Sequence, residues 1–161
     1  MRGRYILAAI LVAGTLDIVP ALWRVGIGVL GFVASGPLGE GIKSAPVWLY
    51  STAGLAVHYL IMTGMVVVYF WLASHSRYAR EHPVPSGLLY GVLLWFFMYW
   101  VVLPIRWPAF WPPTTYSGLA SSEIASNIAL GFFAHCILVG VPIALIASRS
   151  FRHTKDSAPG E

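Results

Sequence analysis

Three ionisable side chains lie inside long apolar segments of the sequence: Asp17, His58 and His135. An ionisable group inside a membrane-spanning helix is costly, so such groups usually pair with one another or mark a site for ions, protons or solutes. A carboxylate beside an imidazole suits proton transfer, because histidine changes its charge near neutral pH. These residue types therefore predict a polar site that handles protons or a small solute.

A purely structural interpretation of the same residues stays open. A buried carboxylate and an imidazole can also satisfy each other's hydrogen bonds, and this pairing would specify helix packing without any activity. Pro20 and Pro142 each remove a backbone hydrogen bond, which frees the carbonyls of Leu16 and Leu138 as further partners. Under either interpretation we expect Asp17 to be hydrogen-bonded to at least one imidazole.

Two cofactor hypotheses use the histidines. His58 and His135, on facing helices, would supply the two axial ligands of a haem b. Cu(I) prefers soft ligands, and His58, Met62 and Met65 share one helical face, with Cys136 as a further soft ligand. Neither set belongs to a longer motif, and methionine in a helix usually only packs. We therefore expect no cofactor and no metal.

Arg24 lies two turns beyond Asp17 on the same helical face, where it would contact either lipid headgroups or a substrate. Gly26, Gly28 and Gly31 match the spacing of a dinucleotide-binding loop, but no strand precedes them, so this function is excluded. The sequence shows no nucleophile with a base and an orienting partner. We expect that the chain is not an enzyme.

Composition sets the elements that must position these residues. Of the 161 residues, 58% are hydrophobic and 10% are charged, whereas a soluble domain is about a quarter charged. A helix needs about 20 apolar residues to cross a bilayer. The sequence therefore predicts an all-α membrane protein, a four-helix transmembrane bundle. Its single transmembrane domain spans residues 1–148, with helices at about 5–24, 46–73, 86–104 and 122–148, and a tail follows at 149–161.

Local signals define the connections between these helices. The first helix cannot continue through residues 26–38, because it would be longer than the bilayer is thick, so this glycine-rich piece is expected to be a short interfacial or re-entrant segment. Pro46 begins the second helix, Ser86 caps the third, and Ser121 or Ser122 caps the fourth. The short loop at 75–85 predicts that the second and third helices are antiparallel neighbours.

The basic residues predict the orientation. Seven flank one side of the spans, namely Arg2, Arg4, Arg77, Arg80, Arg149, Arg152 and Lys155, and three flank the other, namely Arg24, Lys43 and Arg106. By the positive-inside rule both termini and the 75–85 loop are cytoplasmic, so the tail at 149–161 is a cytoplasmic tail. The aromatic, proline-rich stretch at 107–116 is then expected to lie at the outer headgroups, between the third and fourth helices.

The expected partner is the lipid bilayer, and a larger membrane complex or a homo-oligomer stays open. The basic residues form no patch of their own, so we expect no nucleic acid. Two functional classes follow: a bundle with a midplane Asp17, His58 and His135 site for protons or a small solute, or a non-catalytic scaffold or accessory subunit.

Several short motifs carry a resemblance to a known group. They are GTLDI around Asp17, ASGPLG after it, LAVHYLI around His58, HPVPSGLLYGV before the third helix and FFAHCILVGVPIAL around His135. In these motifs, which extend over residues 14–145, the chain resembles small uncharacterised bacterial inner-membrane proteins of the YagU-like group. The resemblance implies four spans and a bacterial inner membrane, and it implies no particular activity.

Overall fold

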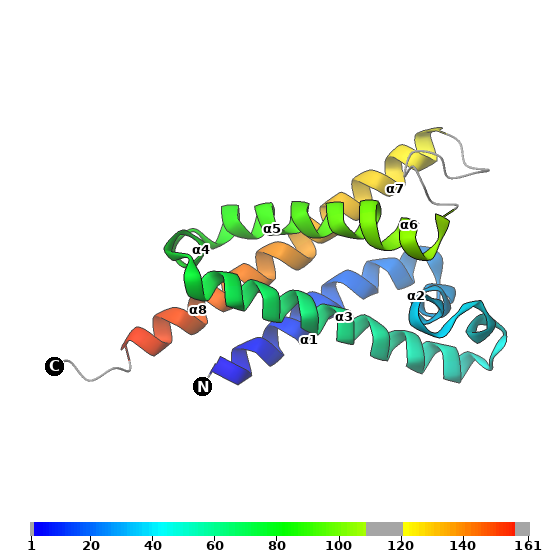
Figure 1. The fold of residues 1–161 in the computed structure, drawn as a ribbon, viewed down its shortest axis with the longest axis horizontal. Coiled ribbons are helices and arrows are strands. Elements are labelled where there is room, and N and C mark those ends of the chain that lie inside the picture. The colour runs from blue at the N-terminus through cyan, green and yellow to red at the C-terminus, as the bar shows by residue number, and fades with distance from the viewer. Residues whose placement is uncertain (1, 109–120, 157–161) are drawn as a thin grey trace.

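Four long apolar helical spans make up most of the molecule (Figure 1). The computed structural model describes residues 2–108 and 121–156, and within these the side chains of all but residues 121–124 and 154–156. The spans are Arg2–Val25, Val47–His75, Pro83–Arg106 and Ala125–His153, each long and apolar enough to cross a membrane. No strand occurs in the described part of the chain. The prediction of an all-α bundle with four membrane spans is confirmed.

The first span is α1 (Arg2–Val25) and the second is α3 (Val47–His75). Helix α2 (Gly28–Leu38) and the 3-10 helix η1 (Glu40–Ser44) connect them, and α4 (Arg77–Glu81) follows α3. The third span contains α5 (Pro83–Phe97), the π-helix η2 (Met98–Val102) and α6 (Leu103–Arg106). The fourth contains α7 (Ser121–Phe133), the π-helix η4 (Ala134–Gly140) and α8 (Val141–Asp156).

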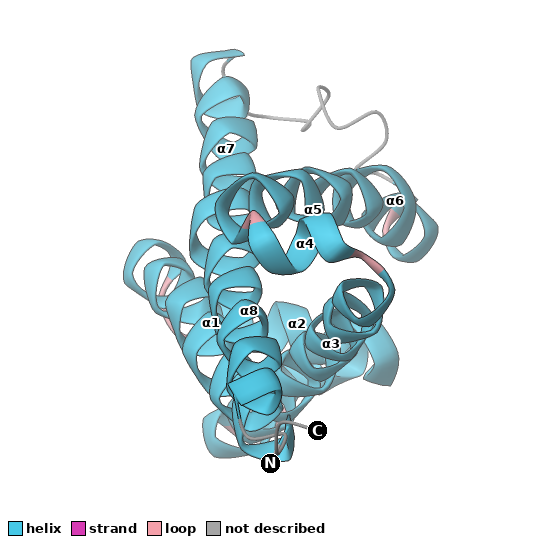
Figure 2. Ribbon diagram, turned by 90° about the vertical axis from the view of Figure 1, so that its left-hand side faces the viewer, coloured by secondary structure: helices cyan, strands magenta, loops and turns pink. Residues whose placement is uncertain are grey.

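Helix α1 packs against α3 and against η4 and α8, as expected for a bundle in which the first span touches the second and fourth. The second and third helices were expected to be antiparallel neighbours, but α3 and α5 lie close together at one end only. They are linked near α4, where Tyr90 donates a hydrogen bond to Met65 O at 2.7 Å, and they diverge from there (Figure 1). Helix α5 packs instead on η4 and α8, which leaves α3 and the third span apart (Figure 2).

Small residues set the close packing of the third span on the fourth. A Cβ atom at Gly140 would lie 2.1 Å from Gly87 O, and one at Gly91 would lie 2.4 Å from the Cα atom of Cys136. Glycine at these points lets the two backbones approach closely, which is the usual basis of helix association in a membrane.

Both π-helical segments end just before a proline: η2 before Pro104 and η4 before Pro142. A proline ring clashes with the carbonyl one turn earlier and leaves it without its N–H partner. A locally wider turn relieves that clash, so the prolines account for the π segments. Pro20, in contrast, lies within the continuous helix α1.

Two predicted boundaries are corrected. Helix α8 extends to Asp156, so the tail predicted from residue 149 is helical over its first part. The third span begins at Pro83, so Ser86 lies inside the helix; its hydroxyl donates to Pro83 O at 3.2 Å. The glycine-rich segment after the first span forms helix α2, and its interfacial or re-entrant placement stays a prediction.

Two expectations fall partly outside the described residues. Of the aromatic stretch at 107–116 predicted at the outer headgroups, residues 109–116 lie outside them. So do the side chains of Ser121 and Ser122, which were predicted to cap the fourth helix.

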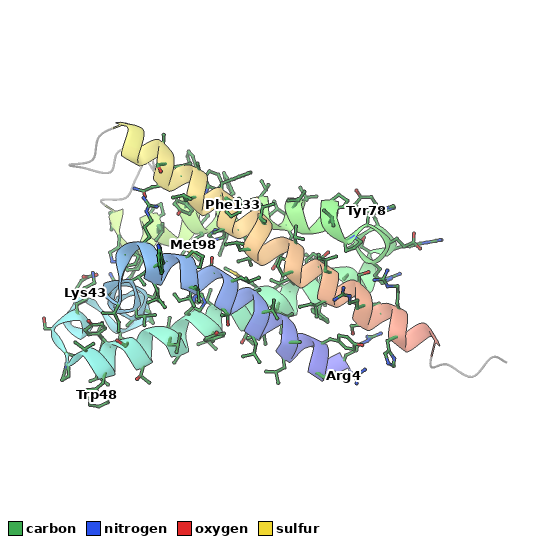
Figure 3. All side chains as sticks on the ribbon, turned by 180° about the vertical axis from the view of Figure 1, so that it is seen from behind. Arg4, Lys43, Trp48, Tyr78, Met98 and Phe133 are labelled. Atoms are coloured by element: carbon green, nitrogen blue, oxygen red, sulfur yellow. The ribbon has the colours of Figure 1, made fainter. Side chains whose placement is uncertain are left out.

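The ends of the spans gather in two groups. The start of α1 and the end of α8 lie at the same end of the molecule (Figure 1). Arg4 and Tyr78 lie at this end, whereas Lys43 and Trp48 lie at the other (Figure 3). The basic residues counted on opposite sides of the membrane are therefore at opposite ends of the fold.

Candidate functional site

A cavity of about 660 Å³ separates α3 from the third span. Its wall also includes residues of α1, α2 and η4, so every membrane span contributes to it. Most of the wall is apolar, including Phe32 and Met98. Asp17, His58 and His135 all line it, so the three ionisable residues singled out in the sequence meet at one cavity.

His58 fixes α3 to α1. The imidazole is 7% exposed, and its Nε2–H donates a hydrogen bond to Gly14 O at 2.9 Å. The neighbouring Tyr59 hydroxyl shares a second hydrogen bond of 2.9 Å with Thr15 Oγ1. A Cβ atom at Gly14 would lie 2.6 Å from Tyr59 Cε1, so glycine permits this close crossing. Asp17 follows Gly14 by about one turn, and the crossing therefore positions its carboxylate beside the cavity.

His135 lies in the π-helix η4. Its Nδ1–H donates to Gly131 O at 2.8 Å, and its ring meets the ring of Tyr99 edge-on, with 6.2 Å between centroids. Tyr99 belongs to the other π-helix, η2, and also lines the cavity. Single π-helical turns are frequent at functional sites, because they re-aim side chains out of the regular helical register.

The predicted hydrogen bond between Asp17 and an imidazole is not formed among the described residues. Each imidazole already donates one N–H to a glycine carbonyl: His58 to Gly14 on α1, and His135 to Gly131 on α7. Within the described part of the chain, the Asp17 carboxylate has no hydrogen-bond partner. The carboxylate therefore borders the cavity without a hydrogen bond to the described residues.

The hydrogen bonds determine what the cavity can accept. In a neutral imidazole one nitrogen is a donor and the other an acceptor, so the second nitrogen of each histidine is an acceptor. An ionised carboxylate only accepts. Asp17, His58 and His135 therefore supply acceptors to the cavity, and their complement is a group with N–H or O–H donors.

The histidine pair does not fit a haem b in this conformation. An axial ligand binds iron through an unprotonated nitrogen, whereas His58 Nε2 donates to Gly14 O and would have to break that bond. For the copper hypothesis, His58, Met62 and Met65 do line the cavity, but Cys136 is not part of its wall. The described residues contain no group of three or more His, Cys, Asp and Glu side chains that could hold a metal ion.

Arg24 has a partner within the chain. Its guanidinium donates a hydrogen bond to Asn127 Oδ1 of α7, and the side chain does not line the cavity. It joins the end of the first span to the fourth, and the expected contact of Arg24 with headgroups or a substrate stays a prediction.

One residue of the cavity was missed by the sequence reasoning. Arg106 was counted only as an outer basic residue, yet it lines the cavity and holds the end of α2. Its Nε donates to Gly36 O at 2.6 Å and a terminal nitrogen donates to Ser35 O at 2.7 Å. The carbonyl end of a helix favours a nearby cation, and Ser35 O also accepts the backbone N–H of Gly39 at 3.0 Å. An arginine directly after an apolar span was the available signal.

Trp107 and Glu40 complete this contact. The Trp107 ring stacks on Phe32 of α2 with centroids 4.3 Å apart, and its Nε1–H donates to Glu40 Oε1 at 2.8 Å. The ammonium of Lys43 and the indole N–H both bond the Glu40 carboxylate and lower its pKa below the usual value. We call Arg106, Trp107, Phe32 and Glu40 the α2 latch, because together they join α2 to the third span.

No protein-family model, curated protein or solved structure matches this chain. The resemblance to the YagU-like group therefore stays a prediction. The function has to be argued from the cavity itself.

Replacing Arg106 with glutamine is expected to loosen α2. The substitution removes a cation from two backbone carbonyls, and hydrogen bonds to charged groups contribute about 1.5–3 kcal/mol each. Hydrogen exchange of the full chain in lipid nanodiscs should show faster exchange across Gly28–Leu38. Arg77→Gln is the matched control: Arg77 pairs with Glu81 at an exposed site, where a salt bridge contributes little. Equal exchange in the two variants would contradict the latch.

Proposed function

We propose that this chain is a multi-pass membrane protein that handles protons or a small solute at its central cavity. In this proposal Asp17 accepts the proton or the positive charge, and His58 and His135 provide the neighbouring polar wall. The observation that carries the proposal is the placement of Asp17, which is the only acidic residue within the four spans. It borders a cavity of about 660 Å³ and makes no hydrogen bond within the described chain.

A structural role explains this placement less well. A carboxylate that served only packing would be expected to bond a neighbouring donor, because leaving a polar group without a partner costs about 1–3 kcal/mol. Nearby donors exist, but the imidazoles bond glycine carbonyls instead. An unpartnered acid inside a span is the usual mark of an ion or proton site.

The proposal includes a bacterial inner membrane with both termini in the cytoplasm. The excess of basic residues at the end of the fold where α1 begins and α8 ends supports the orientation, and the resemblance to the YagU-like group supports the bacterial inner membrane. In this orientation, Asp17 would exchange protons with a solute that enters the cavity from either side of the membrane.

Proton flux tests the proposal. The full chain would be reconstituted into liposomes with a pH-sensitive dye inside, and a pH gradient would be imposed. We expect flux well above that of empty liposomes in the wild type, and flux at the empty-liposome level in Asp17→Asn, because asparagine cannot carry a proton. Glu81→Gln is the control, since it removes a carboxylate on α4 that is remote from the cavity.

Flux that is absent from the wild type, or equal in the wild type and Asp17→Asn, would contradict proton handling. If the amine labelling described below also showed no dependence on Asp17, the alternative of a non-catalytic scaffold or accessory subunit would be favoured.

A further inference from the structure

One side of the cavity wall is exposed at the surface of the bundle. Ile61 of α3, Phe97 of α5 and Ile105 of α6 line the cavity, yet they are 42%, 54% and 78% exposed. Ile61 belongs to α3 and the other two residues belong to the third span, and these two spans diverge beyond α4 (Figure 1). The cavity wall therefore has an exposed apolar edge between these spans, and we call these three residues the side window.

The side window is apolar and belongs to the spans. Its residues lie within Val47–His75 and Pro83–Arg106. When these segments cross a bilayer, the exposed edge between them faces lipid chains instead of water. The end of the cavity near α2 differs, because Arg106 and Trp107 of the latch cover it with polar contacts to α2 and η1.

We propose that the cavity binds a lipid-soluble amphipathic amine, which enters from the bilayer through the side window and places its ammonium at Asp17. The proposal rests on the proposed function and names the class of its ligand. Charge complementarity selects the head group. Asp17, His58 and His135 supply acceptors, and an ammonium group has three donors and no acceptor.

Arg106, the only arginine or lysine among the described residues of the wall, does not compete for the acid. Its guanidinium instead contacts the end of α2 and η1: it donates hydrogen bonds to two carbonyls of α2 and lies 4.0 Å from Glu40 Oε1. The apolar remainder of the wall suits a single alkyl or ring body. Cavities that bind small molecules commonly measure about 300–1,000 Å³, and this one falls in that range.

Photolabelling of the full chain in nanodiscs tests the ligand class. The probe is a long-chain alkylamine with a photoreactive group in its chain, and the control probe is the alcohol of the same length. The amine should label cavity peptides roughly tenfold more than the alcohol, which corresponds to about 1.4 kcal/mol for a charge-assisted contact. Asp17→Asn should remove this preference. Equal labelling by the two probes in the wild type would overturn the proposal.

A second pair of variants tests the route. Ile61→Trp would fill the side window, so it should slow amine labelling several-fold. Leu60→Trp places the same ring on the neighbouring exposed position, which does not line the cavity, and should change nothing. Equal rates in the two variants would overturn lateral entry. A third outcome separates the two proposals. If proton flux depended on Asp17 but the amine and alcohol probes labelled the cavity equally, the proposed function would stand and only the amine ligand would be rejected.

Discussion

Gly140→Ala is expected to destabilise the bundle by about 2 kcal/mol or more, in the upper range of overpacking effects. The new methyl group would lie 2.1 Å from Gly87 O and 3.0 Å from Gly91 N. Both are backbone atoms, so no side-chain rotation can relieve the contact. The third span would have to move away from η4, and it would lose its packing on α8 as well.

Gly64→Ala is the matched control for this prediction. A Cβ atom at Gly64 meets nothing within 4 Å, and Gly64 lies in the long helix α3. Alanine favours a helix over glycine by up to about 1 kcal/mol, so this variant should be as stable as the wild type or slightly more stable. Unfolding in detergent micelles, followed by circular dichroism, measures both. Equal stability of the two alanine variants would contradict the close packing of α5 on η4.

The four spans were predictable because the bilayer imposes a simple requirement. A helix must present about 20 apolar residues, and the stretches around Ala9, Val66, Leu94 and Ile143 do so without ambiguity. Helix ends were less predictable, because capping signals are short. Ser86 looked like a cap, but Pro83 can begin a helix equally well and the chain uses it.

The arrangement of the spans was harder to foresee. A short connection at 75–85 indicates neighbouring helices, but it does not exclude that another helix packs between them. Helix α8 contacts α1, α3 and α5, and α5 follows η4 and α8 because glycines permit it. The resulting separation of α3 from the third span creates the cavity. It depends on residues far apart in sequence, such as Gly87 and Gly140.

The site residues could be named from the sequence, but their hydrogen bonds could not. The sequence predicted a midplane site of Asp17, His58 and His135, and all three do line one cavity. The actual partners of the imidazoles are the carbonyls of Gly14 and Gly131. Carbonyl acceptors are present at every residue, so the sequence does not mark which of them is used. The His58 bond depends on the close crossing of α1 and α3, whereas His135 uses the carbonyl four residues earlier in its own span.

Asp17→Leu is expected to abolish proton flux while leaving the free energy of unfolding unchanged or higher. The carboxylate has no hydrogen-bond partner among the described residues, so leucine breaks no contact and removes the cost of keeping an ionisable group in a span. Asp17→Asn should lose flux to the same extent, since neither side chain carries a proton. Liposome flux and unfolding in micelles would be measured on the same preparations.

Ser148→Ala should show the opposite pattern. Ser148 is 1% exposed, its hydroxyl donates to Arg80 O at 2.6 Å, and it does not line the cavity. Loss of this hydrogen bond should therefore lower the free energy of unfolding by about 1 kcal/mol and leave proton flux intact. The comparison separates the two roles of a polar residue inside a membrane bundle. If Asp17→Leu were less stable than Asp17→Asn while both kept their flux, Asp17 would be a packing residue like Ser148, and the case for a proton or solute site would end there.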